Sequence, residues 1–388
     1  MKKLFYFAAA AVALAACAKN EVIPVNSGEN QEITFNVAPK TKADPEPKKE
    51  AFSTGNVFAS WAYYLPKGTD WNDKSTNQDD PAYPKEYISG AKVSHDGTVW
   101  KAEKSYYWPK DGGKLTFFAY SLNKGDLKLD DSAASTLTCD PFQGIYAHIN
   151  LSVDKNVDFL VADIKADQTA NTTTTGSTGK YYNDGVPTLF RHRLSYVAFN
   201  VKTLKDYSTE GKRLDLKSIS FKNISFYGEY RQVAVSESFP SGFKASTDDG
   251  HVGIVNYTKN STEAPFAQEI ISTNEVVSPF DNFLYIPQTF VKGSDDTKNA
   301  YIEVKYTITT TVPVTTHEGT STKEVVEEVT KNIFLYPATG TTMFEKWEMG
   351  KKYTINLTFT LDEILWDPAV QDWEDVNIGA DTAPIIVG

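Results

Sequence analysis

The sequence predicts an all-β protein in which two β-sandwich domains follow each other along the chain. Short runs of alternating apolar and polar residues recur between turn residues, as in strands with one buried face. Aromatic residues make up 13% of the chain, and they supply the large side chains that fill sandwich cores. Apolar spacings of three and four residues, which indicate helices, are almost missing. A chain of 388 residues is long enough for two such domains.

The N-terminus predicts a lipoprotein signal peptide in residues 1–16. Lys2 and Lys3 precede an apolar run that ends at Ala16, directly before Cys17. The run has 13 residues (4–16), too few for a membrane-spanning helix, which needs ~20. Small residues before a cysteine form a lipobox, so we expect cleavage before Cys17 and acylation of its thiol. The alternative is an ordinary secretory signal with an incidental cysteine.

The net charge limits the possible partners, and the cysteine content limits the possible disulfides. The net charge is -11, and loss of Lys2 and Lys3 with the signal would leave -13 (-11 - 2), so nucleic acid is not an expected partner. Cys139 is the only cysteine besides Cys17. Because acylation of Cys17 leaves no second thiol, no intrachain disulfide is expected. Stability must then come from the hydrophobic core.

The first strand is predicted at residues 32–37, between two polar stretches without periodicity. Ile33, Phe35 and Val37 alternate with polar residues and should form one buried face. Residues 17–30 are expected to be a flexible, lipidated tether, and residues 40–50, with four lysines and two prolines, form a second such stretch. The strand therefore stands alone between segments that a protease could reach.

The remaining elements are expected in two groups. Further strands are predicted at residues 115–120, 196–201, 216–226, 302–308 and 353–361. Residues 311–330 should form a long hairpin that turns near residues 317–319, and residues 342–348 a short helix. The N-terminal sandwich is placed at 31–240 and the C-terminal sandwich at 241–388, divided where Ser, Thr, Gly and Asp cluster.

No motif supports catalysis or a cofactor. Sequence patterns of serine hydrolases, nucleotide-binding loops and zinc proteases are missing. The histidines are dispersed, at positions 95, 148, 192, 251 and 317, and they predict no metal site. Aromatic clusters at residues 61–83 and 106–108 could stack on sugars, but core packing is the simpler interpretation.

Several segments together resemble the Bacteroidales fimbrillin family, the Mfa-like and FimA-like pilus subunits. They are, in order, the lipobox, Glu32-Ile33-Thr34-Phe35, Tyr107-Trp108-Pro109, Arg191-His192-Arg193-Leu194-Ser195, Leu284-Tyr285-Ile286-Pro287-Gln288 and Trp347-x-x-Gly350-Lys351-x-Tyr353. Together they span nearly the whole chain. The resemblance implies two transthyretin-like sandwiches, carried to the outer membrane as a surface-exposed lipoprotein, with a non-enzymatic role in adhesion.

The resemblance also implies partners, which are other fimbrial subunits and a host or bacterial surface receptor. In polymerising relatives a protease removes the first strand, and a strand from the C-terminus of another subunit fills the groove. The candidate donor residues here are Val376, Ile378, Ile385, Ile386 and Val387.

Two features leave alternatives open. Family processing follows an arginine, but the first arginine of this chain is Arg191. The candidate processing sites are therefore lysines, namely Lys40, Lys42, Lys48 and Lys49. An uncleaved anchor or tip subunit is one alternative, and a surface glycan-binding lipoprotein that does not polymerise is another.

Overall fold

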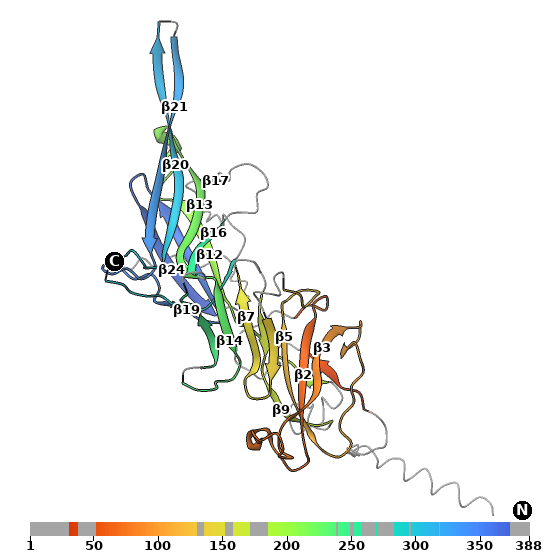
Figure 1. The fold of residues 1–388 in the computed structure, drawn as a ribbon. Coiled ribbons are helices and arrows are strands. Elements are labelled where there is room, and N and C mark those ends of the chain that lie inside the picture. Colours follow the sequence, from red (N-terminus) through yellow and green to blue (C-terminus); the bar gives the residue numbers. More distant parts are fainter. Residues whose placement is uncertain are drawn as a thin grey trace, which may run out of the picture.

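The computed structural model shows an elongated molecule made of β-strands (Figure 1). It describes residues 31–37, 52–129, 136–151, 158–170, 185–237, 240–248, 252–257, 268–270, 283–294, 296–317 and 319–372. Helix in these ranges is limited to two 3-10 turns, Trp71–Asp73 and Ser208–Glu210. Neither is long and apolar enough to cross a membrane. The predicted all-β class is confirmed.

The N-terminal half of the chain forms a large mixed sheet. Its strands are β1 (Thr34–Asn36), β2 (Phe58–Leu65), β3 (Lys85–His95), β4 (Trp100–Ala102), β5 (Lys114–Ser121), β8 (Leu160–Ala162), β9 (Lys165–Gln168), β10 (Val186–Pro187) and β11 (Phe190–His192). They are ordered β10-β1-β4-β3-β2-β5-β8-β11, and β9 pairs with β5. The ring of Phe35 in β1 lies 5.4 Å from that of Phe58 in β2, although β4 and β3 separate these strands. The sheet is therefore rolled around a core, which we call the inner core.

A smaller sheet packs on the outside of this rolled sheet. It consists of β6 (Thr136–Asp140), β7 (Gly144–Asn150), β14 (Tyr227–Arg231) and β15 (Gly242–Ala245), ordered β15-β14-β7-β6. In β5, Phe117 enters the inner core and Phe118 points to the opposite face, where it meets Ile145 and Ile149. Alternation at period two thus buries both faces of β5, because each face has a core of its own.

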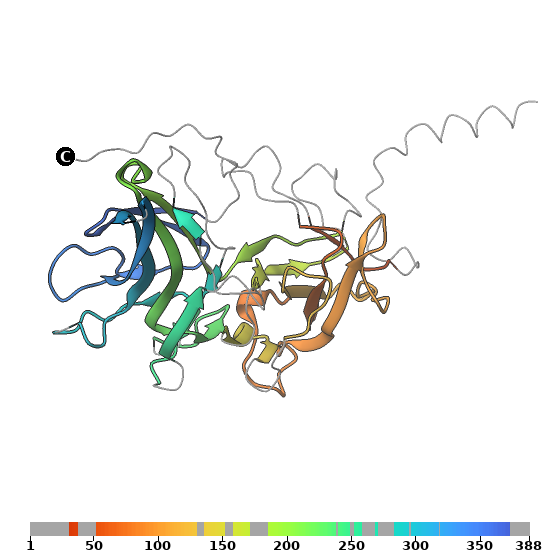
Figure 2. The ribbon, with the colours of Figure 1, turned by 90° about the horizontal axis from the view of Figure 1, so that it is seen from above.

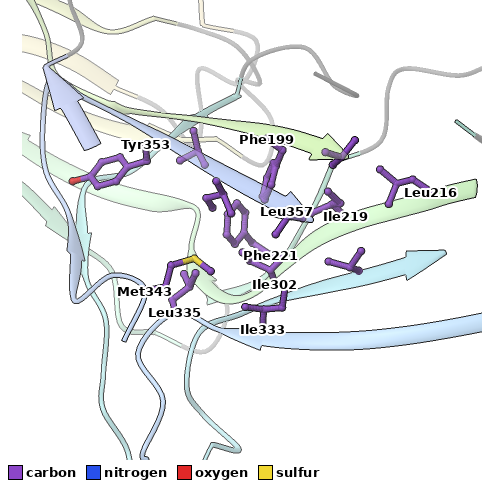
Figure 3. Packing of buried hydrophobic residues seen from close by; sticks show 14 of the residues in the cluster. Phe199, Leu216, Ile219, Phe221, Ile302, Ile333, Leu335, Met343, Tyr353 and Leu357 are labelled. Carbon is purple, nitrogen blue, oxygen red and sulfur yellow. The ribbon is translucent and has the colours of Figure 1, made fainter. Parts of the chain in front are cut away.

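A sandwich of two sheets forms the other end of the molecule (Figure 2). One sheet contains β12 (Ser195–Thr203), β18 (Phe283–Tyr285), β23 (Lys351–Phe359) and β24 (Ile364–Asp372). The other contains β13 (Lys212–Ser225), β16 (Val252–Tyr257), β17 (Gln268–Ile270), β20 (Tyr301–Thr316) and β21 (Gly319–Phe334). Alternate residues of these strands, among them Phe199, Phe221, Ile302 and Leu357, fill the core between the sheets (Figure 3).

The predicted hairpin is confirmed as β20 and β21, which project from the top of the molecule in Figure 1. The predicted helix at residues 342–348 is wrong. Met343 and Phe344 both donate their backbone N–H to Leu335 O, and Lys346–Trp347 form β22, which pairs with β19 (Gln288–Thr289). The apolar spacing that suggested a helix instead comes from a buried, irregular connection.

Strands do not divide between the two ends of the molecule at residue 240, where the sequence placed the boundary. β12 and β13 precede that point, yet they pair with β23 and β20 of the C-terminal sandwich. β15 follows it and pairs with β14 beside the rolled sheet. The described strands therefore cross between the two ends more than once: from β11 to β12, from β13 almost directly into β14, and from β15 to β16.

Candidate functional site: the first strand and its groove

The first strand lies inside its sheet, with a neighbour on each side. β1 pairs antiparallel with β4, where Phe35 faces Trp100, and parallel with β10, where Phe35 faces Val186. Beyond the strand, Ile33 N donates to Tyr106 O at 2.8 Å. Asn36 O accepts a hydrogen bond from the backbone N–H of Thr188, also at 2.8 Å. Loss of this strand would leave backbone groups of both neighbours without partners.

Buried side chains hold the first strand in the sheet, although the strand is short. Ile33 and Phe35 are 2% and 3% exposed, and Val37 packs at the edge of the same inner core. The Phe35 ring makes edge-to-face contacts with Phe58 and Phe117, at 5.4 and 6.0 Å between centroids. Ile33 and Phe35 of the predicted apolar face are therefore buried in a groove lined by aromatic rings, and Val37 is half-buried at its edge.

Gly185 lets β10 approach the strand closely. A Cβ atom at this position would lie 2.7 Å from the backbone carbon of Phe35. Gly185 also has a φ of +92°, in the region that favours glycine. No local sequence signal marks this residue, because its partner in β1 is about 150 positions away in the chain.

Charged residues hold the far end of the sheet next to the inner core. Arg191 Nε donates to Asp163 Oδ1 at 2.8 Å, and Arg191 Nη2 donates to Asp163 Oδ2 at 3.0 Å. Burial alone would raise the pKa of Asp163, but the hydrogen bonds and charge of Arg191 outweigh it and lower that pKa below its usual range. His192 Nδ1 lies 3.0 Å from Asp158 Oδ1. These residues of the family-like segment thus serve the packing of β11 on β8.

Several predicted site residues lie outside the described residues. These are Cys17, Lys40, Lys42, Lys48, Lys49, Val376, Ile378, Ile385, Ile386 and Val387. Of the predicted set, the structure brings together Ile33, Phe35 and Val37. Within the described ranges, no group of three His, Cys, Asp or Glu side chains converges to hold a metal ion.

Comparison with known proteins identifies the family of the chain. The model of the fimbrillin-like family matches residues 62–373. A fimbrial protein from Bacteroides vulgatus is 18% identical, with a TM-score of 0.49 over 89% of this chain and 100% of that one. The C-terminally truncated tip fimbrial protein Mfa3 from Porphyromonas gingivalis is 12% identical, with a TM-score of 0.35 over 88% and 100% of the two chains. No curated protein matches the sequence. On the extent of the family match, this chain belongs to the fimbrillin-like family.

Proposed function

We propose that this protein assembles into fimbriae by strand exchange, after proteolysis removes its first strand. Family membership makes the chain a structural subunit of cell-surface fimbriae, not an enzyme. The observation that supports strand exchange is the position of β1, which fills a slot between β4 and β10 over a buried aromatic core. A strand in such a slot can be replaced by another strand with the same alternation.

The energetics favour replacement once the strand is gone. Burial of a side chain such as Ile33 or Phe35 contributes roughly 1.5–3 kcal/mol. An empty groove would expose the rings of Phe58 and Phe117 together with unpaired backbone groups. Both costs disappear when an incoming strand enters, so polymerisation becomes favourable only after cleavage.

Two sequence segments would complete this mechanism. Cleavage would occur among Lys40, Lys42, Lys48 and Lys49, which follow β1 in the chain. The donor would come from residues 373–388, which follow β24 and include Ile385, Ile386 and Val387. A donor that replaces β1 needs about five residues, at ~3.3 Å each.

Acylation of Cys17 would anchor the subunit to the outer membrane. Each buried methylene of an acyl chain contributes ~0.8 kcal/mol, so two or three chains hold a protein firmly. The cleavage sites follow the lipidated residue in the chain, so cutting there would also separate the sandwiches from their anchor. Processing and release would then be the same event.

Limited trypsin digestion of the folded mature protein tests the proposal. We expect the earliest cut between Lys40 and Lys49, followed by filaments in electron micrographs. A variant with Lys40, Lys42, Lys48 and Lys49 all changed to Gln should stay monomeric under the same treatment. A matched variant with four exposed lysines changed elsewhere, Lys67, Lys104, Lys128 and Lys323, should still polymerise. Filaments from the first variant, or none from the unchanged protein, would contradict strand removal at this site.

A surface glycan-binding lipoprotein that does not polymerise is the second candidate. The observation that favours it is the partial exposure of aromatic side chains near the first strand, including Tyr107 at 41%. Trp71 and Trp108 from the same clusters are buried in the cores. This candidate predicts no filaments under any protease treatment.

A further inference from the structure

A cleft of about 530 Å³ opens at the surface of the rolled sheet. Tyr64 from β2 and Tyr87 from β3 line it, and the chain at Pro109 and Asp111 lines the other side. Every part of its wall belongs to the described residues. The cleft neither overlaps the groove of the first strand nor depends on strand exchange.

The two tyrosines present apolar ring surface to the cleft. Tyr64 Oη donates to Asp111 Oδ2 at 2.7 Å, and Tyr87 Oη donates to Tyr107 O at 2.6 Å. With their hydroxyl hydrogens used by the protein, the rings mainly offer aromatic surface. Gly113 makes room for the ring of Tyr64, because a Cβ atom at position 113 would lie 2.1 Å from Tyr64 Cε2.

Hydrogen-bond donors and hydrogen-bond acceptors both surround these rings. Asp111 is fixed by its bond from Tyr64 and by Gly113 N, which donates to Asp111 Oδ1 at 2.9 Å. These hydrogen bonds lower the pKa of Asp111, so it is an anion at neutral pH. Lys85 and Glu86 are exposed beside it in β3 and also line the cleft. The cleft therefore holds hydrogen-bond donors and acceptors next to aromatic surface.

We propose that this cleft binds a saccharide. A sugar ring has an apolar C–H face that stacks on an aromatic ring, and its hydroxyls both donate and accept hydrogen bonds, which matches mixed carboxylate and ammonium groups. A peptide would be recognised largely through its backbone. The β2 backbone at Tyr64 has partners on both sides, Lys85 in β3 and Leu115 in β5, so a peptide cannot add to β2. β4 pairs with β3 only at residues 93–95, and a peptide that pairs with β3 beside Tyr87 is the competing outcome of the test.

Titration of the folded mature chain with defined probes tests this site. The probes are chitotriose, mannotriose, galactotriose and sialyllactose, with a proline-rich peptide as a fifth. We expect at least one saccharide to bind and Tyr87→Ala to weaken it about three- to tenfold, the range measured for aromatic contacts. Tyr87→Phe keeps the ring and should change the affinity less than about twofold, since the hydroxyl already bonds within the protein.

Val99→Ala is the matched control, because Val99 is as exposed as Tyr87, at 37% for both residues, and its side chain does not line the cleft. It should leave binding unchanged. The proposal is overturned if no saccharide binds, if Tyr87→Ala binds as well as the unchanged protein, or if only the peptide binds. Filament formation is a separate readout, so a failure here leaves strand exchange intact, and the reverse also holds.

Discussion

Gly185 sets how closely β10 can pack on the first strand. Its φ of +92° and the 2.7 Å approach to Phe35 both select glycine. Gly68 has a nearly identical φ of +90°, but a Cβ atom there would have no neighbouring atom within 4 Å. Comparing the same substitution at these two glycines therefore separates the cost of backbone strain from the cost of the contact with β1.

We predict that Gly185→Ala destabilises the protein more than Gly68→Ala does. Both substitutions carry the strain of positive φ, about 1–3 kcal/mol. Only the first also pushes a methyl group into the β1 backbone, which should cost about 1–3 kcal/mol more. Chemical denaturation of both variants measures the difference. Equal losses in the free energy of unfolding would show that the contact between β10 and β1 is not tight.

The residues of the first strand and the residues that hold it differ in how far the sequence reveals them. Ile33, Phe35 and Val37 could be predicted from alternation within a short segment, and their burial follows that pattern. Gly185, Trp100 and Phe117 could not, since they meet the strand only after the sheet has rolled up. Long-range pairing decides the groove, and a period-two pattern contains no information about it.

Among the elements, the β20–β21 hairpin extends furthest from any core. Its pairing with β13 ends at Thr310, so the part beyond that residue is a two-stranded ribbon with mostly exposed side chains. Its length could be predicted from the run of Thr and Val around a central turn. The prediction of a helix at 342–348 was wrong. Trp347 and Phe344 are buried by tertiary contacts, and the spacing of apolar residues cannot distinguish this burial from the apolar face of a helix.

We predict that the outer part of this hairpin adds little stability. Replacing residues 312–323 by Asn-Gly, a favoured two-residue turn, should shift the Tm by less than about 2 °C, because exposed changes usually cost under about 0.5 kcal/mol. As a control, Ile308→Ala removes a core side chain of the same strand and should cost about 2–5 kcal/mol. Thermal unfolding would contradict this account if the shortened hairpin lost as much stability as the control.

At the scale of the whole molecule, β13 and β14 join the two ends into one body. Leu151 N donates to Phe226 O, the residue between these strands, at 2.8 Å, so the connection is itself held by the N-terminal part. The sequence could predict two groups of strands from length and patterning. It could not predict that the chain crosses between them, because the crossing depends on strands that pair across long separations, as β12 does with β23.

The first strand lies in the rolled sheet, whereas β24, the last described strand, lies in the C-terminal sandwich. β24 ends at Asp372, which pairs with Lys351 near the junction between the two parts of the molecule. Under the proposed strand exchange, the groove of one elongated subunit would accept a strand from the next copy, so that copies would add in a line. Head-to-tail contacts of this kind form filaments when the rotation between copies does not close a ring. The elongated shape in Figure 1 therefore suits a fibre subunit.

The most direct test of the central claim is the affinity of trypsin-cleaved protein, freed of its first strand, for a synthetic peptide of residues 31–37. Strand exchange predicts saturable binding of one peptide per chain. It also predicts that a peptide with Phe35→Ala binds at least about a hundredfold more weakly, because truncating a buried Phe costs about 3–5 kcal/mol. Absence of binding, or equal binding of the two peptides, would contradict a groove that is specific for the first strand.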